Sequence, residues 1–253
     1  MLRIYLSGHM AIESGGTLIR GSDFPGKQGR AAFAYLVRAR VGPVARSALT
    51  DALWPDAPPP SWNAALSSIV SKLRSLLARA GLDGAAVLRT ADGCHELHLP
   101  HDSWIDHEVA ADSIHEAEAA LKAGDPGRAY GPSAVAHHIA RRPFLPGETG
   151  RWFEERREKL ASLLVRALEC RAEVYLWNRE FPLAIEVARE AVALRPFRES
   201  GYRLLMRSHA AAGNAGEALW VYEQCRALMS EELGVTPSRE TRMVHFEVLQ
   251  SSA

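Results

Sequence analysis

The stretch LTDALWPDAPPPSWNAALSSIVSKLRSLL, residues 49–77, decides the fold of the N-terminal part of the chain. Its first helical run is expected to end at Trp54, because the residue before a proline is disfavoured in the α-helical conformation. Three prolines, Pro58–Pro60, then stiffen a loop, and Ser61 is a good N-cap for a longer helix. The stretch therefore predicts two helices joined by a rigid connection. The predicted buried face of the second helix is Leu66, Ile69, Leu73 and Leu76.

The residues on either side of this stretch complete a small α+β domain. Residues 1–24 alternate apolar and polar side chains in short pieces around Gly15-Gly16, which is typical of a small antiparallel sheet. Helical spacing over 26–40 and again over 44–54 predicts two helices before the proline loop. Downstream, the extended runs AAVLRT and HELHL flank Ala91-Asp92-Gly93, a strong hairpin signal. A sheet, three helices and a hairpin in this order predict a winged helix-turn-helix.

Beyond about residue 105 the strand signals end, and the remainder is predicted to be helical. Pairs of residues recur 34 residues apart, among them Ala184 with Ala218 and Ala188 with Tyr222. This is the tetratricopeptide (TPR) period, in which paired helices are joined by a tight turn. The expected helices are 114–123, 128–139, 150–177, 182–194, 199–212, 215–232 and 239–249.

The predicted fold class is therefore mainly α. An N-terminal winged helix-turn-helix (α+β) is expected over residues 1–102, and an all-α, TPR-like helical-repeat domain over residues 103–253. The charge is also unevenly divided between the two predicted domains. The chain has no net charge, but residues 1–100 hold eleven Lys and Arg against seven Asp and Glu. This asymmetry favours a nucleic-acid-facing N-terminal part and a separate acidic module.

The three cysteines, Cys94, Cys170 and Cys225, form no CxxC pair, which is typical of a reduced, cytoplasmic protein. The N-terminus has no signal-peptide pattern, and no apolar run approaches the length of a membrane span. We therefore expect a cytoplasmic protein without a membrane segment.

Two motifs point toward other chemistry, and we disfavour both. Residues Gly21–Gln28 fit the phosphate-loop pattern G-x-x-x-x-G-K but end in Gln28, which cannot supply the hydroxyl that ligates magnesium. Cys94, His95, His98 and His101 cluster near the hairpin, but adjacent Cys94 and His95 point to opposite faces of a strand. We interpret these histidines as scattered surface residues and expect no metal and no cofactor.

Acidic residues near position 155 carry no catalytic signature either. Glu154, Glu155 and Glu158 share a predicted helix with several arginines, so an ion-paired solvated face explains them better than catalytic carboxylates do. No serine lies in a G-x-S-x-G elbow. We therefore predict that the chain is not an enzyme.

The exposed side of the helix after the proline loop is rich in small hydroxyls and cations. A solvated surface would normally carry Glu and Lys, since serine is a poor helix former. Small hydroxyls permit close approach to a surface, and Lys and Arg supply charge toward phosphates. We therefore predict DNA recognition by this helix, with a wing contact from the hairpin. The predicted DNA-binding residues are Asn63, Ala64, Ser67, Ser68, Ser71, Lys72, Arg74 and Ser75 on the helix, and Arg89 and Thr90 on the wing.

These residues also resemble a known family. The run ALTDALWPDAPPPSWNAALSSIVSKLRSLL is similar to the OmpR-like winged helix of the Streptomyces antibiotic regulatory protein (SARP) family, and PGKQGRAAFAYLV resembles that domain's first helix. Near the C-terminus, EALWVYEQCRALMSEELGVTPSRETRMVHFEVL resembles the end of the bacterial transcriptional activator domain. The short, glycine-rich sheet region and Pro143–Gly147 depart from the family pattern.

The resemblance implies a transcriptional activator that binds direct repeats in promoters, with two protomers side by side as a homodimer on DNA. It also implies that the proline loop contacts RNA polymerase. That loop consists of Trp54, Pro55, Asp56, Ala57, Pro58, Pro59, Pro60 and Ser61. The helical-repeat domain would dimerise, contact polymerase or bind a small effector. The alternative is a protein-interaction or effector-sensing module whose winged helix does not bind DNA.

Overall fold

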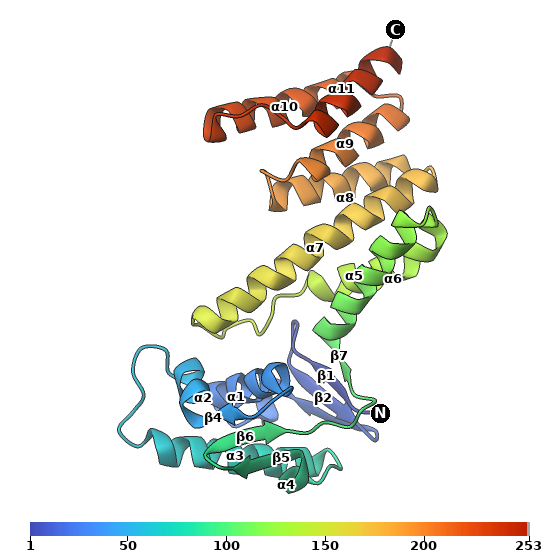
Figure 1. Ribbon diagram of the computed structural model, residues 1–253. Coiled ribbons are helices and arrows are strands. Elements are labelled where there is room, and N and C mark those ends of the chain that lie inside the picture. The colour runs from blue at the N-terminus through green and yellow to red at the C-terminus, as the bar shows by residue number, and fades with distance from the viewer. Residues whose placement is uncertain (252–253) are drawn as a thin grey trace. The chain divides into compact units, whose positions relative to one another are not determined.

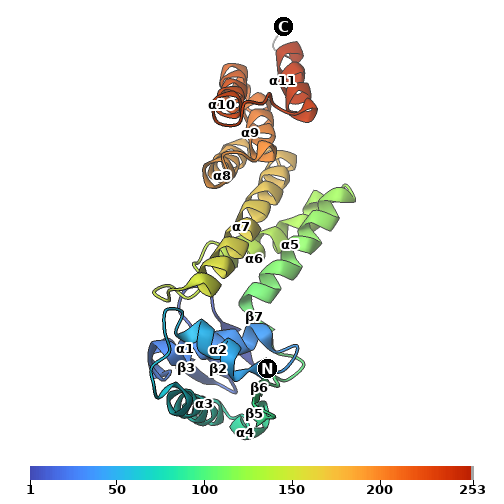
Figure 2. The ribbon, with the colours of Figure 1, turned by 60° about the vertical axis from the view of Figure 1, so that its left-hand side comes forward.

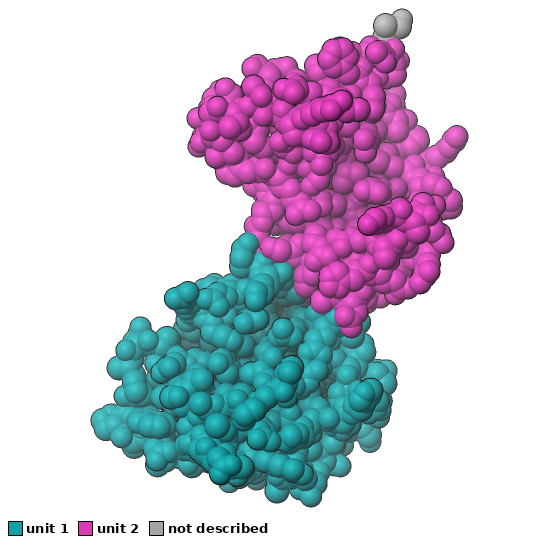
Figure 3. All heavy atoms as spheres, viewed as in Figure 1, with its two compact units in different colours: residues 1–109, 142–160 teal, residues 110–141, 161–253 magenta. Residues whose placement is uncertain are grey.

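The computed structural model describes residues 1–251 and contains, within them, eleven α-helices and seven short strands (Figure 1). It is 66% helical with a small N-terminal sheet, which confirms the predicted mainly α class. Contacts divide the chain into two compact units, which Figure 3 colours separately. Unit 1 comprises residues 1–109 and 142–160, and unit 2 comprises residues 110–141 and 161–253. Whether residues 1–102 and 103–253 are separate domains stays a prediction.

Unit 1 begins with a sheet of four short strands. Strands β1 (Arg3–Tyr5), β2 (Ala11–Ser14) and β3 (Thr17–Arg20) are antiparallel, as expected. Gly15 and Gly16 form the two-residue turn between β2 and β3 with φ of 56° and 83°, the left-handed conformations that glycine tolerates best. A fourth strand, β7 (Trp104–Ile105), pairs in parallel with β1 and was not predicted.

Three helices follow the sheet. After a 3-10 turn, η1 (Gly21–Asp23), helix α1 spans Gly26–Ala39 and α2 spans Arg46–Leu53, where the N–H of Trp54 donates to the carbonyl of Thr50. The predicted second helix began two residues too early, because Val44–Ala45 form strand β4. Helix α3 spans Trp62–Arg79, directly after the proline loop.

The buried face of α3 is close to the predicted one. Leu66, Leu73 and Leu76 are buried, as expected. Ile69 was wrongly included, since it is only half-buried at the edge of the face, whereas Val70 and Leu77 are buried. This apolar face packs α3 into unit 1 and leaves its hydroxyl-rich side toward solvent.

The predicted hairpin is present beside α3 (Figure 2). Strands β5 (Leu88–Ala91) and β6 (Cys94–Leu97) are joined by Asp92 and Gly93, both with positive φ, as a type I′ turn requires. Strand β4 pairs with the other edge of β6 and completes a three-stranded sheet. The expected extended run was wrong before Leu88. There, helix α4 (Gly84–Val87) forms a single turn, because the Asp83 carboxylate accepts hydrogen bonds from the first N–H groups.

The segment 142–160 packs within unit 1, although it follows two helices in sequence. The Gly8 N–H donates to the Pro143 carbonyl at 2.8 Å, and the Leu145 N–H donates to the Leu6 carbonyl at 3.0 Å. Arg157 donates to three carbonyls of the loop before it. The loop is therefore fixed by backbone hydrogen bonds to the residues that directly follow β1.

The expected helices of the C-terminal part are all present. The one predicted over 114–123 was too short, because it begins at Asp106, whose carboxylate accepts hydrogen bonds from the N–H groups of Leu6 and Ser7 at 2.8 and 2.7 Å. An acid in the first turn also suits the helix dipole. The helices are α5 (Asp106–Lys122), α6 (Pro126–Ala140), α7 (Arg151–Trp177), α8 (Phe181–Leu194), α9 (Glu199–Ala211), α10 (Ala215–Leu233) and α11 (Arg239–Ser251).

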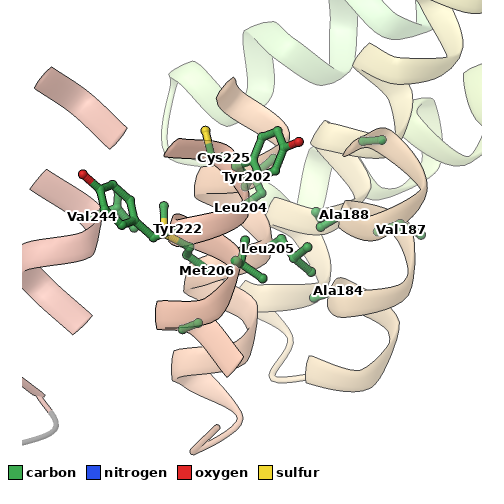
Figure 4. Close-up of a cluster of buried hydrophobic side chains, with 14 of the residues drawn as sticks. Ala184, Val187, Ala188, Tyr202, Leu204, Leu205, Met206, Tyr222, Cys225 and Val244 are labelled. Carbon is green, nitrogen blue, oxygen red and sulfur yellow. The ribbon is translucent and has the colours of Figure 1, made fainter. Parts of the chain in front are cut away.

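The core of unit 2 repeats with the predicted period. Ala184 on α8 and Ala218 on α10, which are 34 residues apart, are both fully buried in one apolar cluster with residues of α9. Figure 4 shows part of this cluster, with Ala184 labelled. The turns before these helices repeat as well, since Arg179 and Gly213 both have positive φ. Small residues at equivalent positions let the paired helices approach closely, which is the geometry of a helical repeat.

Among the helices of residues 1–251, none combines the length and the apolar character that a membrane crossing requires.

Candidate nucleic-acid interface

One side of α3 presents polar atoms from consecutive turns. Asn63, Ser67, Ser71 and Ser75 follow one another at four-residue intervals, so they form a single row along the helix. The Ser67 and Ser75 hydroxyls donate to the carbonyls of Asn63 and Ser71, at 2.9 and 3.3 Å. Each of these two hydroxyl hydrogens is thereby used within the helix, and the hydroxyl oxygens are left to act as acceptors. Ala64, Ser68 and Lys72 form a neighbouring row and are exposed.

Arg74 has a more structural position than the sequence predicted. It is half-buried, and its Nε donates to the Leu88 carbonyl at 2.8 Å while its Nη2 donates to the Thr90 hydroxyl at 2.8 Å. Both acceptors belong to β5, so Arg74 ties the wing to α3. Two of the predicted DNA-binding residues, Arg74 and Thr90, are therefore joined to each other. The exposed Arg89 donates from Nε to the Ala86 carbonyl at 3.1 Å and bonds locally.

Arg46 belongs to the same surface and was missed in the sequence. It is the first residue of α2, and its Nη2 reaches the side-chain oxygen of Asn63 at 2.5 Å and the hydroxyl of Ser67 at 3.1 Å. A cation in the first turn of a helix opposes the helix dipole, so its presence there signals a partner elsewhere. Arg46 therefore brings a second guanidinium to the polar row of α3.

His95 connects these two arginines and corrects the interpretation of the hairpin histidines. It is 1% exposed, so it is not a surface residue, unlike His98 and His101. Its Nε2 lies 3.4 Å from Nη1 of Arg46, and its Nδ1 lies 2.9 Å from the Thr90 hydroxyl. Burial, and then the nearby charges of Arg46 and Arg74, lower the pKa of the His95 imidazole below its usual range.

The predicted polymerase-contact loop, residues 54–61, is largely exposed. Trp54 and Pro59 are half-buried, and the other six residues are exposed. Pro55 borders a cleft of about 350 Å³ in unit 1, which Tyr35 of α1, Asp51 of α2 and Trp152 of α7 also line. The rings of Tyr35 and Trp152 pack with centroids 5.0 Å apart. The loop thus presents three of its four prolines to solvent, beside a cleft walled by aromatic rings.

The segments that suggested other chemistry have ordinary structural positions. Gly26 begins α1, and Nζ of Lys27 donates to the Thr149 hydroxyl at 3.2 Å. Glu154 and Glu155 pair with Arg157 and Arg151 at 2.8 and 2.9 Å, which confirms an ion-paired face. In residues 1–251, no group of three or more His, Cys, Asp or Glu side chains is arranged to hold a metal ion. That the chain is no enzyme and uses no cofactor stays a prediction.

Comparison with known proteins places these observations in a family. The family described as bacterial transcriptional activator domain matches residues 105–249, more than half of the chain. The regulatory protein AfsR of Streptomyces coelicolor is 29% identical over 241 residues, which is 95% of this chain and 23% of AfsR. The transcriptional regulatory protein EmbR of Mycobacterium tuberculosis is 28% identical over 225 residues, which is 87% of this chain and 57% of EmbR.

The fold has a solved counterpart. The structure of M. tuberculosis EmbR in complex with a low-affinity phosphopeptide superposes with a TM-score of 0.86 at 26% sequence identity. The match covers 98% of this chain and 65% of that one. The chain therefore spans about a quarter of AfsR and somewhat more than half of EmbR.

Proposed function

The chain belongs to the bacterial transcriptional activator domain family and is a SARP-type relative of AfsR and EmbR, and from this premise we propose that it is a sequence-specific, DNA-binding transcription regulator. The observation that carries the proposal is the surface of α3. A polar row without acidic side chains lies between two arginines, and a hairpin wing is bonded to the same helix. Double-stranded DNA is the partner that such a surface fits best.

In this proposal α3 enters the major groove and the hairpin lies against the backbone or the minor groove. Serine and asparagine side chains can bond base edges or phosphates, and their small size allows the helix to approach closely. Lys72 supplies charge toward a phosphate. Arg46 and Arg74 present guanidinium groups at either end of the polar row, where the phosphate backbones flank the groove.

We further propose that the protein activates transcription by contacting RNA polymerase through the loop 54–61. The support is that most of this loop is exposed and that prolines restrict its conformations, so little entropy is lost when it binds a partner. Two copies would occupy direct repeats side by side, as a homodimer on DNA. Unit 2 would then serve dimerisation, polymerase contact or effector binding.

The DNA proposal is tested by selecting bound fragments from the source genome and measuring their affinity against random DNA. Binding should weaken steeply with salt, because neutralised phosphates release counterions. Lys72→Ala should lower the slope of log affinity against log salt by about one, since it removes one phosphate contact. The matched control is Lys122→Ala on α5, an exposed lysine of unit 2, which should leave the slope unchanged. If no fragment binds better than random DNA at low salt, the chain is not a sequence-specific regulator.

The polymerase proposal needs a variant that separates transcription from DNA binding. Asp56→Arg reverses the charge of the exposed loop, and we expect it to reduce transcription in a reconstituted assay while promoter affinity is retained. Asp102→Arg is the control, because Asp102 is also an exposed acid of unit 1 but lies outside the loop. Equal transcription by the wild-type protein and Asp56→Arg would refute the assignment of the loop.

A further inference from the structure

His95 lies on β6, the central strand of the three-stranded sheet. On strand β6 it stands opposite Val44 of β4 on one side and Thr90 of β5 on the other. Two polar groups meet its ring, one at each nitrogen: Arg46 at Nε2 and the Thr90 hydroxyl at Nδ1. A buried imidazole thus links the arginine that reaches α3 to the threonine of the wing.

The chemistry of the neighbours fixes the state of this ring. A guanidinium can only donate hydrogen bonds, so Nε2 must accept the one from Arg46 and carries no hydrogen. The neutral ring therefore holds its hydrogen on Nδ1 and donates it to the Thr90 hydroxyl oxygen. That oxygen also accepts from Nη2 of Arg74 at 2.8 Å, which its two lone pairs allow. A continuous chain of hydrogen bonds then runs from α2 through the sheet to α3.

We propose that His95 is a positioning residue for DNA discrimination, by which we mean the preference for a specific fragment over random DNA. The neutral ring holds Arg46 against Asn63 and Ser67 and holds Thr90 on the wing. The inference rests on the proposed DNA-binding function. Protonation would place a hydrogen on Nε2 and a positive charge beside Arg46, so the arginine would be repelled from its position on α3. Contacts that depend on this geometry would be lost, whereas general attraction to phosphates would remain or increase.

The sign of the pH effect follows from the surroundings of the ring. The charged groups facing His95 are Arg46 from α2 and Arg74 from α3, and both oppose protonation, as does burial. The pKa of His95 is therefore lowered, and the ring is neutral at pH 7 and above. Discrimination should be complete in that range and should be lost as the pH falls through the pKa of the folded-state ring, which lies below the ordinary histidine value of about 6.5.

The experiment measures affinity for a selected fragment and for random DNA between pH 8 and pH 5, at constant salt, with circular dichroism to verify folding. For the wild-type chain we expect the ratio of the two affinities to fall about tenfold, the usual cost of losing one specific contact. In His95→Gln the amide oxygen can accept from Arg46 and the amide nitrogen can donate to Thr90. This variant should keep the ratio at pH 8 and lose its pH dependence. His98 is an exposed histidine nearby, and in His98→Gln the affinity ratio should depend on pH as it does in the wild-type protein.

The possible results separate this inference from the function on which it rests. If the wild-type chain discriminates at pH 8 and its ratio stays constant down to pH 5, His95 has no such role, whatever the variants do. The same holds if folded His95→Gln retains the full pH dependence. If the wild-type chain does not discriminate at any pH, the proposed function itself fails and the inference fails with it.

Discussion

The polar surface of α3 in unit 1 and the helical repeat in unit 2 are each built from a different kind of contact. Around α3, long polar side chains bridge elements that are distant in sequence, as Arg46 and Arg74 do. In unit 2, helices α8, α9 and α10 meet through an apolar cluster that contains both buried alanines and larger side chains (Figure 4). Removing a polar side chain beside α3 should therefore affect recognition, whereas removing an apolar side chain from the cluster of unit 2 should lower stability.

The largest effect is expected for Leu205→Ala in α9. Leu205 is buried in the apolar cluster, so truncation removes apolar contacts and leaves a cavity. Such substitutions cost about 2–5 kcal/mol in the free energy of unfolding. Chemical denaturation measures this change, and Leu183→Ala, at a 43% exposed position on α8, should change stability by less than about 0.5 kcal/mol. Equal losses for the two variants would contradict the assigned core.

The next effect tests the repeat itself. Ala184→Leu and Ala218→Leu insert the same extra volume at equivalent, fully buried positions, and each should cost about 1–3 kcal/mol in unfolding free energy. Similar values for both would support the structural equivalence of positions 34 residues apart, because the two sites would then be packed equally tightly. Ala211→Leu, at an exposed position near the end of α9, is the control and should be nearly neutral. A large cost at only one of the two buried sites would break the equivalence.

Arg46→Ala should change DNA affinity more than stability, in contrast to the core substitutions. Its guanidinium holds Asn63 and Ser67 but is only partly buried, so the unfolding free energy should change by less than about 1 kcal/mol. Affinity for a selected DNA fragment should fall about tenfold, or about 1.4 kcal/mol. Arg46→Lys should recover only part of it, since lysine lacks the planar fork of donors. Fluorescence anisotropy measures the affinities. If Arg46→Ala binds the fragment as tightly as the wild-type protein does, Arg46 is not part of the interface.

The smallest effect is the acid sensitivity of unit 2. Burial, followed by the charges of Arg171 and Arg141, lowers the pKa of His137 to about 4. Between about pH 6.5 and pH 4 the unfolded chain therefore binds more protons than the folded one, so stability is lost as the pH falls through this window. Because the residue is half-exposed, we expect no more than about 1 kcal/mol. In His137→Gln this part of the pH dependence of unfolding should disappear, and its persistence would assign the effect to other groups.

Much of the fold follows from rules that act over a few residues. The Trp54-Pro55 end of α2 and the Asp92-Gly93 turn were predicted, because each depends on local backbone preferences. The extended run assigned to Ala85–Val87 failed for a related reason. The Asp83 carboxylate caps a helical turn there, and this capping outweighed the alternation of side chains.

The candidate site was predictable only in part. The residues of α3 were recognised, because hydroxyls on an exposed helix face contradict helix propensity and so require a reason. The partners of these residues were not. Arg46 lies 17 residues from Asn63, and His95 lies 49 residues from Arg46, so no short pattern connects them. His95 also resembles its exposed neighbours in sequence, and only the tertiary packing around β6 buries it.

Most of the helices, the main turns, the 34-residue period and the polar side of α3 could be predicted from the sequence, because each arises from backbone sterics or from the spacing of side chains along one element. Only the tertiary structure shows that Arg74 holds the wing, that Arg46 reaches α3 and that His95 is buried beside Arg46 and Thr90. Those pairings depend on how separate elements pack together, since a side chain reaches only a few ångströms from its own backbone.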